Sequence, residues 1–203
     1  MGAQHEEVGA DLRGVDWSLR ELAGERFTGC RFEDADLSEA VLRDCVFTEC
    51  DLSGVAFNAS EHSGTAFLRC RLRRTSFFAA VLTGCKLTGS VFEGRCTLRP
   101  LTVSGGDWSY LSVRQQDLSG LDLSGVRLRE ADLSGCDLSG AVLAGCDLAY
   151  GRLAETRLAG ADLRGAELTG VDLRELDLTG VRLDLAQAVA LATAHGAEVS
   201  WED

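Results

Sequence analysis

Large apolar residues recur at every fifth position along almost the whole chain. The series begins at Leu12 and runs to Phe92, and its one polar member is His62. The frame then shifts by one residue between Glu93 and Thr97, and the series resumes at Leu98 and continues to Leu183. A helix repeats about every 3.6 residues and a strand every 2, so a period of five fits neither element alone.

A second, smaller residue stands two positions before each central one. It is often alanine, as at Ala35, Ala131 and Ala161, and elsewhere valine, threonine or cysteine. Each unit therefore directs one small and one large side chain inward and three outward, so the chain must turn a corner at every unit. Four corners make a square coil of about 20 residues, stacked at the ~4.8 Å spacing of neighbouring strands. This pattern predicts an all-β solenoid of about nine coils over residues 10–183, preceded by an N-terminal tail over residues 1–9.

A helical pattern replaces the period of five after Leu183. Asp184 is a candidate N-cap, with Gln187 three residues later, and four apolar residues share one helix face. Those residues are Leu185, Ala188, Val189 and Ala192. Because so short a helix is marginal alone, its apolar face must pack on something. We expect residues 184–203 to form a helix and tail that both cap the last coil and pair two rods into a homodimer.

The eight cysteines all occupy the small inward position, two residues before a central one. They are Cys30, Cys45, Cys50, Cys70, Cys85, Cys96, Cys136 and Cys146. A thiol at such a position behaves as a slightly larger alanine, and the chain has no C-x-x-C pair. Reduced, buried thiols are therefore expected, without disulfides and without a metal site.

His62 occupies a central, inward position among phenylalanines. A general base or metal ligand would need a second suitable residue nearby, and the pattern supplies none. The alternatives are a hydrogen-bonded core histidine or a local bulge over residues 60–64. The chain also lacks the G-x-S-x-G, P-loop and dinucleotide fingerprints, so we expect neither a cofactor nor an enzyme.

Acidic residues outnumber basic ones by 32 to 20, which gives a net charge of -12. Such a surface repels nucleic acid and anionic membranes and favours basic partners or simple solubility. The first ten residues are polar, unlike a signal peptide, and no apolar run approaches the ~20 residues of a membrane span. These features predict a cytoplasmic protein that binds neither nucleic acid nor membrane directly.

Stacking one coil on the next aligns carboxylates in columns, provided that the shift near Glu93 is absorbed as a bulge. One column is Asp16, Asp36, Asp117, Asp137 and Asp177; the adjoining one is Glu21, Glu61, Asp122 and Asp162; the opposite one is Asp11, Asp51, Asp132 and Asp172. The second half of the chain is the more acidic. Two interpretations remain open: a charged binding face, or a residue that the repeat favours and that keeps the rod soluble.

The units 131–135 and 161–165 read Ala-Asp-Leu-Ser-Gly and Ala-Asp-Leu-Arg-Gly. They resemble the consensus of the pentapeptide-repeat family, Ala-(Asp/Asn)-Leu-x-x, and the resemblance covers residues 10–183. It implies a right-handed quadrilateral β-helix.

Within that family the chain is similar to the MfpA-type fluoroquinolone-resistance proteins, relatives of Qnr, in segments 89–92, 98–102 and 187–196. The resemblance implies a DNA-mimicking protein that binds DNA gyrase, modulates or inhibits supercoiling, and protects the enzyme from fluoroquinolone-type poisons. The expected gyrase-binding surface is Asp117, Asp122, Asp132, Asp137 and Asp177. The alternatives are a generic pentapeptide-repeat interaction scaffold or a self-resistance factor of an antibiotic producer.

Overall fold

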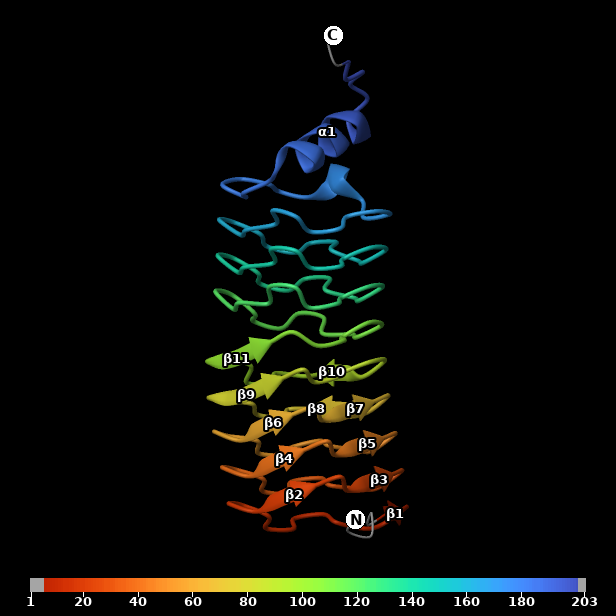
Figure 1. The fold of residues 1–203 in the computed structure, drawn as a ribbon, viewed down its shortest axis with the longest axis vertical. Coiled ribbons are helices and arrows are strands. Elements are labelled where there is room, and N and C mark those ends of the chain that lie inside the picture. Colours follow the sequence, from red (N-terminus) through yellow and green to blue (C-terminus); the bar gives the residue numbers. More distant parts are fainter. Residues whose placement is uncertain (1–5, 201–203) are drawn as a thin grey trace.

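The computed structural model describes residues 6–200, which form a rod of stacked coils with the first strand at one end and the α-helix at the other (Figure 1). One short 3-10 helix, η1 (Leu173–Glu175), and one α-helix, α1 (Leu185–Ala194), follow the strands. The strands are β1 (Glu6–Val8), β2 (Glu21–Ala23), β3 (Arg26–Thr28), β4 (Val41–Arg43), β5 (Val46–Thr48), β6 (Glu61–Ser63), β7 (Ala66–Leu68), β8 (Arg71–Arg73), β9 (Ala80–Thr83), β10 (Val91–Glu93) and β11 (Leu101–Ser104). The predicted all-β solenoid with a short C-terminal helix is confirmed.

Every strand pairs in parallel with a strand of the next coil. Phe27 pairs with Phe47, and Phe47 with Phe67, so the register advances by one four-unit coil. Isolated bridges continue this spacing beyond the strands, as far as the pair Asp162–Arg182. Four such ladders, five residues apart along the chain, make the four faces of the rod.

The shift in the repeat is confined to one coil. Glu93 still pairs with Arg73, but Thr97 pairs with Ser76, so one extra residue is inserted between them. Thr102 then pairs with Val81 in the shifted register, and the columns above the insertion stay aligned with those below. The insertion is therefore a bulge, which is the condition on which the alignment of the predicted columns depended.

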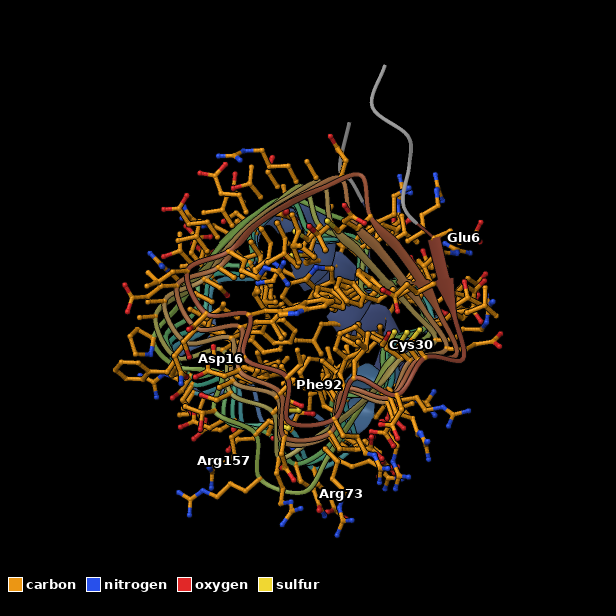
Figure 2. The ribbon with its side chains drawn as sticks, turned by 90° about the horizontal axis from the view of Figure 1, so that it is seen from below. Glu6, Asp16, Cys30, Arg73, Phe92 and Arg157 are labelled. Atoms are coloured by element: carbon orange, nitrogen blue, oxygen red, sulfur yellow. The ribbon has the colours of Figure 1, made fainter. Side chains whose placement is uncertain are left out.

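The central residues meet on the rod axis, as the period predicted. Figure 2 shows their side chains filling the middle of the coil while charged groups lie at the rim. The rings of Phe27, Phe47 and Phe67 stack with centroids 5.0 and 5.1 Å apart, and leucines take over this role beyond the bulge. Each buried Leu or Phe contributes roughly 1.5–3 kcal/mol, so this continuous core holds the coils together.

All eight cysteines are free and buried in the small inward position. Their thiols donate to backbone carbonyls, as Cys136 does to the Val113 oxygen at 2.9 Å. Burial raises the pKa of Cys136 and of Cys146 to about 11, so both thiols stay protonated at neutral pH. The prediction that these residues pack the core as thiols is confirmed.

The solenoid begins earlier than the sequence indicated. Residues 1–9 were expected to form a tail, but Glu6–Val8 is β1 and pairs with β3. The apolar period does not reach this segment, because Glu7 stands at its central position. Backbone pairing with the coil above is therefore what orders it. Residues 1–5 lie outside the described part of the chain.

Helix α1 lies across the last coil (Figure 1). Asp184 caps its first turn in a capping box with Gln187, as predicted. The buried Gln187 amide also donates to the carbonyls of Leu163 and Ala166. The Leu163 oxygen already accepts from the Ala166 N–H, whereas the Ala166 oxygen would otherwise be left open at the end of the ladder. The helix thus covers the coil through Gln187 rather than through the predicted apolar face. No helix among residues 6–200 is long and apolar enough to cross a membrane.

Candidate functional site

One face of the rod gathers carboxylates with few cations among them. We call it the acidic face. Bridges join Asp16 to Asp36 and Asp117 to Asp137, and Asp177 continues the column two coils further on. The full column is Asp16, Asp36, Ala56, Ser76, Thr97, Asp117, Asp137, Arg157 and Asp177. Five of these nine described positions are carboxylates, and they are separated by the uncharged run of Ala56, Ser76 and Thr97 and by one arginine, Arg157.

Each aspartate of this kind also stabilises the corner that follows it. One oxygen of Asp117 accepts from the backbone N–H and the hydroxyl of Ser119, at 3.0 and 2.7 Å. Asp137 and Asp177 accept from the backbone N–H two residues on in the same way. A short side chain that closes the turn locally explains why the repeat favours aspartate here. Part of the acidity therefore has a structural role.

The second carboxylate oxygen has no hydrogen-bond partner among the described residues at Asp122 and Asp177, whereas at Asp117 it accepts from Arg99. Hydrogen bonds from Ser119, Ser124 and Thr179 lower the pKa of Asp117, Asp122 and Asp177, so these groups are charged at neutral pH. The side chain of Asp117 is 62% exposed although Arg99 lies 3.3 Å away. Exposed charges of this kind attract an oppositely charged partner through the solvent, and added salt weakens that attraction.

The neighbouring face alternates in sign, and we call it the mixed-charge face. Its column is Asp11, Arg31, Asp51, Arg71, Val91, Ser112, Asp132, Arg152 and Asp172. Arg31 lies 3.0 Å from Asp11, and Arg114 lies 3.8 Å from Asp132. Because opposite charges alternate on both sides of the uncharged pair Val91 and Ser112, the charges of this face largely cancel.

The five predicted site residues fall on three faces. Asp117, Asp137 and Asp177 share the acidic face, with Arg157 between the last two and 2.6 Å from Asp137. Asp122 lies on the adjoining face, five residues further along the coil, with Asp162 two coils beyond it. Asp132 lies on the mixed-charge face, on the opposite side of the rod from Asp122. A single flat partner surface cannot contact both Asp122 and Asp132.

The arginine partners of these carboxylates did not enter the sequence prediction. Arg99 and Arg157 lie beside Asp117 and Asp137, one coil away. A signal was available for Arg157, which stands 20 positions from Asp137 in the same column, but not for Arg99, which stands 18 positions from Asp117 and outside its column. Charge should therefore have been summed down each column, not along the chain.

His62 is a hydrogen-bonded core histidine, one of the two structural alternatives. Its Nε2 lies 2.8 Å from the Ser60 hydroxyl, and its ring packs on Phe57 and Phe67. Strand β6 pairs regularly on both sides, so there is no bulge at this position. Burial lowers the pKa of His62 to about 3, and the ring is neutral in the folded protein.

His62 is expected to make the rod less stable in mild acid. The unfolded chain binds a proton at this residue below about pH 6.5, whereas the folded protein does not until about pH 3. Stability contributed by the neutral ring is thus complete above pH 6.5 and falls by about 2 kcal/mol by pH 5. Urea unfolding at pH 7 and pH 5 should show this loss. The variant His62→Leu, which matches Leu42 and Leu82 in the same column, should not; an equal loss in both would contradict the assignment.

Apolar side chains fill the axis of the rod, and its charged side chains lie on the four outer faces. Sequence comparison identifies the class of protein. The family model for a pentapeptide repeat region matches residues 21–96, and that for pentapeptide repeats, eight copies, matches 117–149 and 146–184. The chain belongs to the pentapeptide-repeat proteins. No curated protein matches it by sequence.

Solved structures resemble the rod over most of its length. A trypsin-treated variant of QnrB1, described as a plasmid-mediated fluoroquinolone resistance protein, is 26% identical, with a TM-score of 0.55; the match covers 97% of this chain and 90% of that one. HetL from the cyanobacterium Nostoc, described as involved in heterocyst differentiation regulation, is 23% identical, with a TM-score of 0.46 and coverage of 89% and 90%. The second likeness concerns the fold alone.

Proposed function

We propose that this rod is a DNA-mimicking protein that binds DNA gyrase, modulates its supercoiling activity and protects it from fluoroquinolone-type poisons. The acidic face is the observation that carries the proposal. Where its carboxylates stand in adjacent coils, as at Asp16–Asp36 and Asp117–Asp137, they are one coil spacing of ~4.8 Å apart, against about 3.4 Å between phosphates along one DNA strand. A basic protein groove that holds DNA would therefore meet short runs of negative charge at a similar spacing on this face.

The likeness to QnrB1 supports the same proposal. That protein is described as conferring fluoroquinolone resistance, and the similarity extends along nearly the whole of both chains. The segments that resemble the MfpA-type proteins, which lie at the bulge and in α1, point in the same direction. Asp117, Asp137 and Asp177 are the leading contact residues, and Asp122 extends the surface around the corner. Asp132 belongs to the self-compensated face and contributes less.

A supercoiling assay with pure gyrase tests the proposal. Added rod should inhibit supercoiling, and in the presence of a fluoroquinolone it should reduce the amount of cleaved DNA. Binding should weaken as salt is added, because the attraction is between exposed charges. A rod that neither binds gyrase at low salt nor changes either reaction would exclude this function and leave the scaffold alternative.

The same proposal includes a homodimer through the C-terminal end. Leu185 is 68% exposed, and Ala188 beside it on the helix is exposed as well. Val189 and Ala192 are half-buried, and the opposite side of α1 holds Gln187 against the coil. An apolar face turned away from the rod at its very end suits a two-fold contact with a second copy.

The variant Leu185→Glu is therefore expected to be a monomer. A carboxylate at the centre of an apolar two-fold contact would meet its own copy, and the like charges repel. Light scattering after size exclusion measures the mass directly. Thr193→Glu, on another side of the same helix, is the control and should remain dimeric. A wild-type rod that is monomeric, or a Leu185→Glu rod that stays dimeric, would contradict the proposed interface.

A further inference from the structure

Unpaired arginines gather at one corner of this acidic rod. Arg73 and Arg74 lie at the corner between the mixed-charge and acidic faces, and Arg95 and Arg114 lie at the same corner in the coils beyond. All four are exposed, and Arg73, Arg74 and Arg95 have no ion pair among the described residues. Figure 2 shows Arg73 pointing away from the coil. We call these four residues the arginine corner.

Neighbouring arginines do have partners, which sets the corner apart. Arg71 forms an ion pair with Glu93 at 2.8 Å, and Arg99 lies 3.3 Å from Asp117. Glu93, the carboxylate next to the corner, therefore already forms an ion pair with Arg71. Arg114 makes only a loose contact, 3.8 Å from Asp132. The positive charge of the corner is left uncompensated on a rod whose net charge is -12.

The bulge in the repeat creates this corner. Arg95 falls in the stretch that carries the one inserted residue, between Glu93 and Thr97, and it projects between the coil of Arg74 and that of Arg114. Bulges commonly redirect a side chain that a regular ladder would place elsewhere. Here the insertion adds one outward residue, an arginine, to the corner.

A buried side chain holds the bulge in one shape. Gln116 is 5% exposed, and its amide oxygen accepts from the Cys96 N–H at 3.0 Å. Its amide nitrogen donates to the carbonyls of Gly94 and Arg114, at 2.8 and 3.0 Å. The backbone on both sides of Arg95 is therefore held in place, and with it the positions from which Arg95 and Arg114 project.

An open hollow lies beside the corner. Its volume is about 430 Å³, and it is lined by residues of the bulge and of the coil above, among them Arg95, Arg114 and Gln115. Gly94 lies at the edge of the hollow and leaves room for the Arg74 side chain. A Cβ atom at position 94 would lie only 3.3 Å from the Cγ of Arg74. The positive charge of the arginine corner therefore lies beside a hollow near the middle of the rod.

We infer that the arginine corner binds a short acidic segment of a partner protein and so fixes the position of the rod along that partner. Guanidinium groups match carboxylates in shape and charge, and an exposed arginine without a partner offers all of its donors. The corner spans three coils, roughly 10 Å at ~4.8 Å per coil. In an extended peptide, side chains on one side recur about every 6.6 Å, so two or three carboxylates fill it.

The surroundings favour a peptide over a nucleic acid. A DNA strand would continue past the corner onto Asp117 and the rest of the acidic face, where like charges repel it. A short acidic segment can end at the corner. The positive arginine corner borders the negative acidic face. A partner binds well only if its own acidic and basic groups are placed to match both. This inference does not require that the partner be gyrase.

Fluorescence anisotropy with a labelled oligoglutamate peptide tests the inference. The full-length rod should bind the peptide at low salt and should not bind a matched oligoglutamine peptide. The triple variant Arg73→Gln/Arg74→Gln/Arg95→Gln should bind oligoglutamate roughly tenfold more weakly or worse, since three exposed charge contacts are lost. All three side chains point outward, so the thermal midpoint should change little.

The control is Arg26→Gln/Arg43→Gln/Arg152→Gln, which removes the same charge from exposed arginines elsewhere and should bind like the wild type. Equal weakening in both triples would attribute binding to net charge and overturn the inference. So would an absence of peptide binding. An oligo-dT strand that binds more tightly than the peptide, and loses binding in the first triple only, would show a nucleic-acid site instead and would also overturn it.

Discussion

Replacing Phe47 by alanine is expected to destabilise the rod by about 3–5 kcal/mol. Phe47 is completely buried, and its ring stacks on Phe27 at 5.0 Å and on Phe67 at 5.1 Å. The coils above and below are fixed by backbone ladders on every side, so they cannot close around the missing ring. The lost burial and the remaining cavity both add to the cost. Urea unfolding at neutral pH measures the free-energy difference.

Phe78→Ala is the matched control for this substitution. Phe78 is 50% exposed at a corner of the rod, outside the central series, and its removal should change stability by no more than about 0.5 kcal/mol. If the two variants lose similar stability, the inward column is not what holds the coils together. A loss in Phe47→Ala below about 1 kcal/mol would lead to the same conclusion.

The triple variant Asp117→Asn/Asp137→Asn/Asp177→Asn is expected to bind gyrase at least about tenfold more weakly at low salt. Asparagine keeps the oxygen that accepts from the backbone two residues on, so the corners of the coil should be preserved. What is lost is the negative charge of the acidic face. Binding of the purified rod to gyrase, measured at two salt concentrations, gives both the affinity and its electrostatic part.

A second triple on the mixed-charge face separates position from total charge. Asp51→Asn/Asp132→Asn/Asp172→Asn removes the same charge and also keeps the turn acceptor of each side chain, as Asp51 and Asp132 show at 2.9 and 3.1 Å. Its gyrase affinity should fall by less than about twofold, since arginines alternate with these carboxylates. Equal losses in the two triples would mean that net charge, not the acidic face, governs binding.

Much of this fold could be predicted because its period is visible in single residues. Most Leu and Phe residues of the central series are core residues, so the inward column and the buried thiols followed from spacing. The position of the one-residue shift was visible too, but the bulge that absorbs it was not. Strand β1 could not be predicted in this way. Glu7 breaks the apolar pattern, and backbone pairing with the next coil orders the segment instead. Helix α1 was predicted, but the contact through Gln187 was not, because it depends on carbonyls that only the finished coil presents.

The site was harder to predict than the fold. The repeat placed Asp117 and Asp132 in separate columns. How far the charge of each column is compensated depends on arginines one coil away from a carboxylate, such as Arg157 beside Asp137 and Arg114 beside Asp132. The dual role of each aspartate, as turn acceptor and surface charge, also became visible only in the hydrogen bonds. The arginine corner needs both the bulge and the pairing of Arg71 with Glu93, which spacing alone does not specify.

The most direct test asks which face of the rod touches gyrase. A photocrosslinking amino acid at Arg157 would lie on the acidic face, and one at Arg152 would lie on the mixed-charge face of the same coil. Both positions hold an exposed arginine, so the two substitutions change charge equally. After irradiation with gyrase, position 157 should give a crosslinked product and position 152 little or none. Crosslinking from position 152 alone, or equally from both, would contradict the assignment of the acidic face as the binding surface.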